Sequence, residues 1–119
     1  MTPFLKLQVE GSRATITMNR PDKRNALHRD AIAELLQMFG DLQLEKRIRA
    51  VILTGEGTAF CAGMDLDEMK ATAEATDPHL LWRRDAELYQ ELLEKMLRFP
   101  KPILAAVNGP AVAGGAGVV

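Results

Sequence analysis

Hydrophobic and polar residues alternate in two short segments near the start of the chain. Every second residue is apolar in residues 5–9 and again in residues 14–18, and Gly11-Ser12 separates the two runs. Such alternation places one face of a strand against a core and the other in water. The pattern predicts a β-hairpin over residues 5–18.

Two longer segments, residues 27–47 and 80–99, repeat their apolar residues with the 3.6-residue period of an amphipathic helix. Proline at position 100 stops the second one. A short, continuously apolar run follows each helix, at residues 50–55 and 103–107, and is typical of a parallel strand covered on both faces. The order ββαβαβ predicts a layered α/β domain.

Composition narrows the class of protein. The chain has 119 residues, 47% hydrophobic and 26% charged, which suits one soluble globular domain. A net charge of −1 gives no electrostatic footprint for nucleic acid, and no segment near the start has the roughly 18 apolar residues of a membrane span. Cys61 is the single cysteine, so neither an internal disulfide nor a zinc cluster is expected. We expect a cytoplasmic protein that binds neither nucleic acid nor membrane.

The last seven residues, Ala-Gly-Gly-Ala-Gly-Val-Val, are apolar and rich in glycine. Domains usually end in a solvated segment, whereas this one would need a cover. We therefore expect residues 1–119 to be a single domain that is truncated.

Two loops rich in small residues follow the predicted buried strands, at residues 60–66 and 113–115. Small side chains allow a ligand to approach the backbone amides, and two such loops together could form an oxyanion hole. From the residues alone, the alternative that the glycines only turn the chain and permit tight packing stays open.

Three segments together resemble the enoyl-CoA hydratase/isomerase (crotonase) family in their order and spacing. They are Asn-Arg-Pro with Asn-Ala-Leu in residues 19–27, Phe-Cys-Ala-Gly-Met-Asp-Leu in residues 60–66, and Lys-Pro-Ile-Leu-Ala-Ala-Val-Asn-Gly with Gly-Gly in residues 101–115. The resemblance covers essentially the whole chain and corresponds to the N-terminal half of a family member. It implies a spiral of ββα units, present here only in its N-terminal part.

The resemblance also implies an enzyme that binds acyl-CoA thioesters and stabilises their enolate between two backbone amides. Those amides belong to Met64 and Gly114, so the side chain of Met64 should matter little. Coenzyme A is part of the substrate, and no separate cofactor or metal is implied. Family members assemble as trimers or hexamers, and the full-length protein is expected to do so as well.

Further contacts to the substrate are implied by the same match. Lys23, Arg24 and Ala26 would line the adenine end of coenzyme A. The residues flanking the pantetheine and thioester would be Ala62, Gly63, Asp65 and Leu66, with Asp65 fixing the turn rather than moving a proton.

Trp82 and Tyr89 fall on the second predicted helix, where they either line the acyl pocket or simply pack. Cys61 is more readily explained as a small buried hydrophobe than as a nucleophile.

The chain departs from the family pattern at one chemically important position. The first of the two family glutamates would lie at position 117, which is glycine here, and the second would lie beyond Val119. Hydration of a 2-enoyl-CoA in fatty acid metabolism, a lyase reaction, is the leading expectation. The alternatives are a double-bond isomerase, another crotonase reaction, or a non-catalytic acyl-CoA-binding fragment.

Overall fold

The computed structural model describes residues 4–119, which form a four-stranded sheet in the order β1-β2-β3-β4. Strands β1 (Leu5–Glu10) and β2 (Arg13–Met18) form the predicted antiparallel hairpin. Strand β3 (Ala50–Gly55) runs parallel to β2, and β4 (Ile103–Ala106) runs parallel to β3. The loops after β3 and β4 therefore leave the sheet at the same edge.

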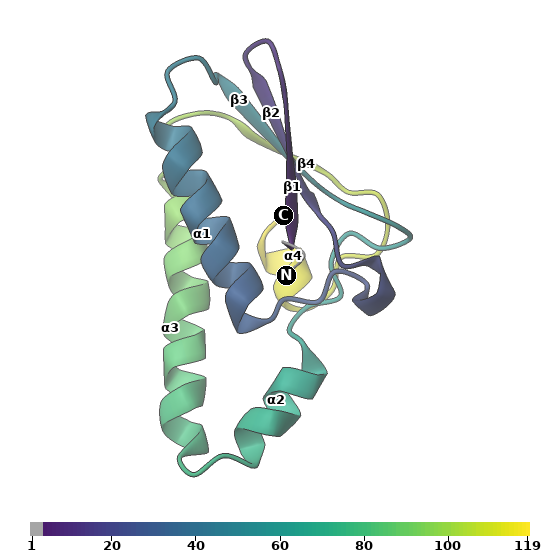
Figure 1. Cartoon of the computed structure of the whole chain (residues 1–119), viewed down its shortest axis with the longest axis vertical. Coiled ribbons are helices and arrows are strands. Elements are labelled where there is room, and N and C mark those ends of the chain that lie inside the picture. Colours follow the sequence, from purple (N-terminus) through teal and green to yellow (C-terminus); the bar gives the residue numbers. More distant parts are fainter. Residues whose placement is uncertain (1–3) are drawn as a thin grey trace.

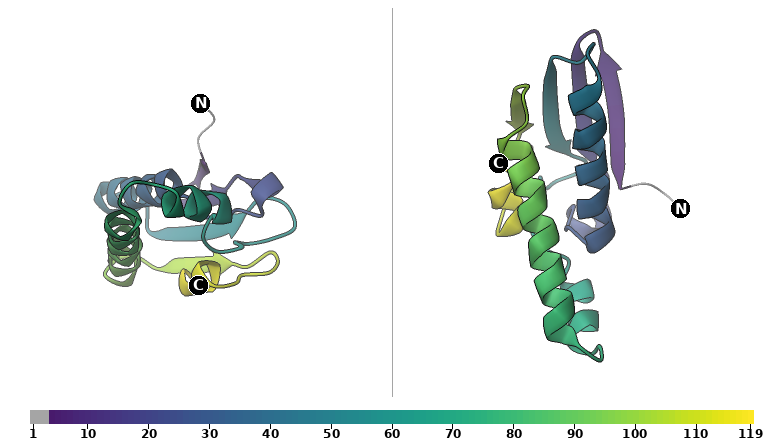
Figure 2. Two further views of the ribbon diagram at one scale, coloured as in Figure 1. Left: turned by 90° about the horizontal axis from the view of Figure 1, so that it is seen from below. Right: turned by 90° about the vertical axis from the view of Figure 1, so that its left-hand side faces the viewer.

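Two long helices connect these strands, as the apolar periodicity predicts. Helix α1 (Arg29–Leu44) leads into β3, and α3 (Pro78–Leu97) leads into β4. The helices lie side by side (Figure 1), and in the right-hand view of Figure 2 α1 lies in front of the sheet, with α3 next to it on the side of β4. None of the helices in residues 4–119 is long and apolar enough to cross a membrane.

Shorter elements carry the chain through its loops. A 3-10 helix, η1 (Pro21–Lys23), follows β2, and α4 (Gly114–Gly117) follows the loop after β4. The acidic residues Asp65, Asp67 and Glu68 indicate a helix start, which is confirmed by helix α2 (Leu66–Ala73), although the ββαβαβ order does not include this helix. Only Thr72 of its eight residues is buried.

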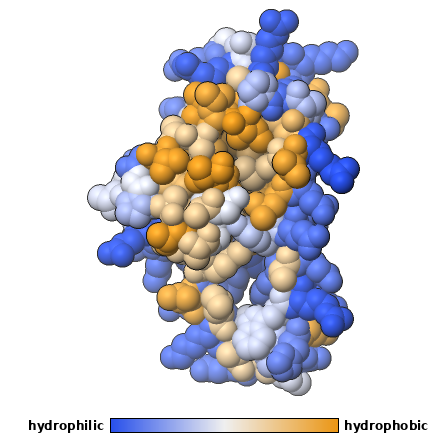
Figure 3. Space-filling model, turned by 180° about the vertical axis from the view of Figure 1, so that it is seen from behind, coloured by the Kyte–Doolittle hydropathy of each residue, from blue (hydrophilic) through white to orange (hydrophobic). Residues whose placement is uncertain are grey.

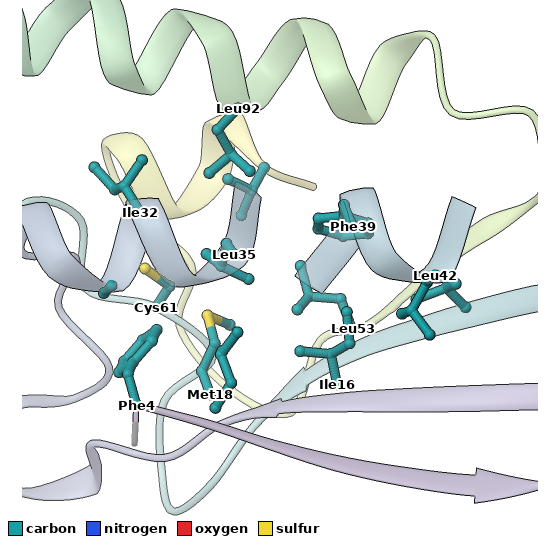
Figure 4. Packing of buried hydrophobic residues seen from close by; sticks show 14 of the residues in the cluster. Phe4, Ile16, Met18, Ile32, Leu35, Phe39, Leu42, Leu53, Cys61 and Leu92 are labelled. Carbon is teal, nitrogen blue, oxygen red and sulfur yellow. The ribbon is translucent and has the colours of Figure 1, made fainter. Parts of the chain in front are cut away.

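The core lies between α1 and the sheet (Figure 4). Leu35 and Phe39 on α1 face Ile16 and Leu53 on β2 and β3, and all four side chains are buried. Ile32 is also buried, on the side of α1 that faces Leu92 of α3. Burying an aliphatic or aromatic side chain of this size stabilises a fold by about 1.5–3 kcal/mol. This cluster holds the strands in position for the loops that follow them.

Coverage of the sheet differs from the sequence prediction. Strand β3 buries Val51 and Leu53 fully but leaves Ile52 only half-buried. The prediction of a strand covered on both faces is wrong for β4. Its Ile103 and Ala105 pack against the core, so Leu104 points to the opposite face of the sheet, where it is 54% exposed. Apolar side chains gather on the face seen in Figure 3. Large exposed hydrophobic residues of the C-terminal segments are Leu97, Leu104, Val107, Val112 and Val119.

A buried amide ties the loop before α1 to the loop after β3. Asn25 is fully buried with φ of +59°, and its Nδ2 donates to the carbonyls of Glu56 and Ala59, each at 3.0 Å. Its Oδ1 accepts from the Arg20 amide at 2.8 Å. Asparagine is among the few non-glycine residues that tolerate this backbone region. Asn25 thus meets both a conformational and a hydrogen-bonding demand.

We expect Asn25→Ala to lower the free energy of unfolding by about 2–4 kcal/mol, because it removes the three hydrogen bonds of a buried side chain and leaves alanine at a positive φ. The control Asn25→Gly removes the same hydrogen bonds but tolerates the backbone angle, so it should be about 1 kcal/mol less damaging. Urea denaturation measures both. Equal stability of Asn25→Ala and the unchanged protein would contradict this account.

Candidate functional site

The segment after β3 is paired on both sides with other loops. Cys61 forms a parallel bridge with Ala111, in which the Val112 amide donates to the Cys61 carbonyl at 3.1 Å. Met64 forms a parallel bridge with Leu27, in which the Leu27 amide donates to the Gly63 carbonyl at 2.7 Å. The backbone of residues 60–65 is therefore fixed between the loop before α1 and the loop before α4.

This pairing leaves one amide unused. In a parallel bridge, one of the two residues uses its own N–H and C=O, and these bond to the two neighbours of its partner. Here the Gly63 carbonyl and the Asp65 amide both pair with Leu27, so the Met64 N–H faces the other side. Among the hydrogen bonds of residues 4–119, neither the Met64 N–H nor the Gly114 N–H is a donor.

The two loops that carry these amides touch at Gly63. A Cβ added to Gly63 would lie 3.1 Å from the Ala113 Cβ and 3.6 Å from the Gly114 nitrogen, and Gly63 has φ of +101°. Ala113 itself has φ of +49° and ψ of −122°, which costs a residue with a side chain on the order of 1–3 kcal/mol. Such strain persists only where the surroundings impose it, and here it sits directly before the Gly114 amide.

Met64 borders two hollows in the surface. The first is a largely apolar cavity of about 300 Å³ that Leu27, Met64, Trp82 and Tyr89 help to line. The second also has a volume of about 300 Å³. Six of the predicted substrate-binding residues line the second hollow, namely Lys23, Ala26, Ala62, Met64, Asp65 and Leu66. A ligand that ran from one hollow to the other would pass Met64.

Three predicted residues, Arg24, Gly63 and Gly114, line neither hollow. Arg24 is exposed, and its backbone carbonyl accepts a hydrogen bond from the Ala62 amide at 3.0 Å. Gly63 serves through its backbone, as described above. The Lys23 ammonium reaches the rim of the second hollow and lies 3.2 Å from the Asp67 carboxylate, where both side chains are exposed.

Asp65 is committed to the local structure. Its carboxylate accepts from the Glu68 amide at 3.0 Å, which caps α2, and lies 2.7 Å from the Arg20 guanidinium. Burial alone would raise the pKa of Asp65, but the Glu68 amide and Arg20 together outweigh burial and lower it. A carboxylate held in this way fixes a turn and is a poor general base.

Cys61 is buried beneath α1 (Figure 4), with its thiol 3.2 Å from the Asn25 carbonyl. Burial raises the pKa of this thiol, although the Gly63 backbone partly offsets the effect. A neutral thiol is a weak nucleophile, so the geometry fits a packing role. Residues 4–119 hold no group of His, Cys, Asp and Glu that could bind a metal ion.

Sequence reasoning did not identify the roles of Arg20 and Asn25. Arg20 donates to the Ala26 carbonyl at 2.9 Å in addition to its contact with Asp65. Arg20 and Asn25 thus shape the second hollow without lining it. Only their place in the Asn-Arg-Pro and Asn-Ala-Leu motifs signals this. Trp82 and Tyr89, for which packing was an open alternative, both line the apolar cavity.

Removing the charge of Asp65 should make stability less dependent on acid pH. A lowered folded-state pKa stabilises the protein above the unfolded-state value of about 3.9, and the gain disappears as the pH falls below it. We expect Asp65→Asn to cost about 1–3 kcal/mol at pH 7 and progressively less below about pH 4.

Denaturant unfolding between pH 3 and pH 7 measures this difference. Asp67→Asn is the matched control, since its carboxylate borders the same hollow but is 81% exposed. A constant difference across the pH range would show that the Asp65 charge is not the cause.

Comparison with known proteins supports one family. The family model described as enoyl-CoA hydratase/isomerase matches residues 8–119. The chain is 39% identical over 105 residues to 4-chlorobenzoyl coenzyme A dehalogenase-2 of Arthrobacter sp., covering 88% of this chain and 38% of the relative. It is 33% identical over 116 residues to 1,2-epoxyphenylacetyl-CoA isomerase of Escherichia coli, covering 98% and 44% respectively.

Solved structures agree on the fold. The enoyl-CoA hydratase from Bacillus anthracis superposes with a TM-score of 0.88 at 30% identity, over 97% of this chain and 43% of that one. The chain thus spans less than half the length of these relatives, and its sheet and helices match the N-terminal part of the crotonase fold. The predicted fold is confirmed, and this chain belongs to the enoyl-CoA hydratase/isomerase family.

Proposed function

We propose that this chain supplies the thioester-polarising part of an acyl-CoA enzyme. The single observation that carries the proposal is the pair of amides at Met64 and Gly114, which come from two loops in contact and donate to no acceptor in residues 4–119. A thioester oxygen placed between them would accept both hydrogen bonds. Donors already fixed in place stabilise negative charge that develops on such an oxygen.

The two hollows suggest how the rest of the substrate lies. The apolar cavity beside Trp82 and Tyr89 suits the acyl chain, and the hollow beside Lys23 and Ala26 suits the pantetheine and nucleotide. Lys23 carries a positive charge to the rim, where a phosphate would bind. The thioester then falls at Met64, between the hollows.

Hydration of a 2-enoyl-CoA is the leading reaction. A base takes one proton from water as the water oxygen adds to C3, and the electron pair of the double bond moves toward the thioester oxygen as an enolate. The enolate then collapses as the protonated base delivers a proton to C2. The Met64 and Gly114 amides would stabilise the enolate. The reaction also needs a positioned acid/base, which neither Gly117 nor the capped Asp65 can provide.

A second reaction class is favoured by Gly117, because it lacks the carboxylate that the best-known hydratases of the family carry there. Isomerisation of the double bond uses the same enolate with a base placed elsewhere. A non-catalytic acyl-CoA-binding role would also need only the two hollows.

Incubation of the complete gene product with a 2-enoyl-CoA separates these outcomes by mass. Hydration adds one water, isomerisation changes only the chromatographic position, and binding changes neither.

Gly114→Pro tests the amide pair directly. It removes the N–H and fixes φ, whereas Gly114→Ala keeps the N–H and places its Cβ at an ordinary 3.4 Å from the Met64 Cε. We expect the proline variant to lose about 100-fold more turnover than the alanine variant. Steady-state kinetics of the complete gene product, with circular dichroism to check folding, measures this.

Met64→Ala should keep turnover within a few-fold, since the backbone amide remains. Equal turnover of the proline and alanine variants at position 114, both folded, would refute the assignment.

A further inference from the structure

Tyr89 reaches from α3 to the loop that carries the second amide. Its hydroxyl donates to the Gly114 carbonyl at 2.6 Å, across 25 residues of sequence, and the half-buried ring lines the apolar cavity together with Met64. Within residues 4–119 this is the side-chain hydrogen bond that reaches the Gly114 backbone. The residue that presents the second amide is therefore tied to α3.

The same hydroxyl occupies the space beside Gly117. A Cβ added to Gly117 would lie well inside van der Waals contact with the Tyr89 Oη, while the next ring atom, Cζ, would be at an ordinary 3.5 Å. The conflict thus involves the hydroxyl and not the ring. Glycine at position 117 and tyrosine at position 89 fit each other, and a side chain at 117 would displace the hydrogen bond to Gly114.

We propose that Tyr89 is a positioning residue of the thioester site, whose hydroxyl holds the Gly114 peptide beside Met64 and whose presence requires glycine at position 117. This inference rests on the proposed function, since it assigns Tyr89 to the same pair of amides. It also means that the acid/base group of the reaction approaches the acyl chain from a direction other than position 117.

Two features explain why Gly114 needs such a restraint. Gly114 has no side chain of its own to pack, and it follows Ala113, whose strained backbone would relax if the loop were free. A hydrogen bond from a hydroxyl anchored on a 20-residue helix opposes that relaxation. Burial is the main cause that raises the pKa of Tyr89, and the electrostatic interaction with Cys61 adds to it. The hydroxyl therefore keeps the proton that it donates.

Tyr89→Phe tests the positioning role, because it removes the hydroxyl and keeps the ring. In the complete gene product with a 2-enoyl-CoA, we expect kcat to fall about 10-fold while KM changes less than about 2-fold, as for an interaction that matters in the transition state. The red shift of the infrared carbonyl stretch of a bound, carbon-13-labelled enoyl thioester should shrink in parallel. Gln90→Ala, an exposed neighbour on the same helix, is the control and should leave the shift unchanged.

The outcomes separate this inference from the proposed function. If the protein without any substitution gives no red shift of the bound carbonyl, the claim that the Met64 and Gly114 amides polarise the thioester is contradicted. If the protein with Tyr89 gives a red shift, and Tyr89→Phe keeps both that red shift and the kcat, only the role of Tyr89 is contradicted.

A double-mutant cycle tests the fit between the two positions. Gly117→Ala should lower the melting temperature of the protein with Tyr89 by about 2–4 °C, because the added methyl group displaces the hydroxyl. In the Tyr89→Phe background the same change meets only an ordinary contact, and alanine is the better helix former, so the melting temperature should stay level or rise. Equal effects of Gly117→Ala in the two backgrounds would overturn the proposed fit.

Discussion

The backbone of residues 60–65 is hydrogen-bonded on both sides, and the arrangement of the site depends on this pairing. One side reaches the loop before α1 through Leu27, and the other reaches the loop before α4 through Ala111. A segment held in this way cannot turn its peptide planes independently. The free Met64 amide is thus a consequence of the pairing itself, because both neighbours of Met64 use their hydrogen bonds on Leu27.

Several interactions outside the hollows serve the same restraint. Asn25 holds the first loop by its buried amide, and Asp65 fixes the start of α2 through the Glu68 amide and Arg20. On the far side, the Tyr89 hydroxyl holds Gly114 against the strain at Ala113. Stability and function are coupled at these positions. Ordering each loop costs conformational entropy, and the amides stabilise charge on the substrate because they are fixed before it binds.

The sequence predicts the regular elements well and the restraints poorly. Periodicity identifies α1, α3 and the hairpin because their apolar residues repeat along the chain, although β1 buries only Leu5 and α3 only Leu92. Helix α2 buries only Thr72, so its acidic start indicates it and periodicity does not. The exposure of Leu104 was missed because an apolar run does not tell which face a neighbour covers. Tyr89 lies at an ordinary helical position, and its contact with Gly114 exists only once α3 packs beside the loop. The motifs indicate both amides, but periodicity cannot indicate what holds them.

The most direct measurement is a crystal structure of the complete protein with an acyl-CoA that it does not turn over. The account predicts that the thioester oxygen lies about 2.7–3.1 Å from both the Met64 and the Gly114 nitrogens, with the acyl group in the cavity beside Tyr89. An acyl-CoA bound with its thioester oxygen away from these amides, and with both N–H groups facing water or protein, would contradict it.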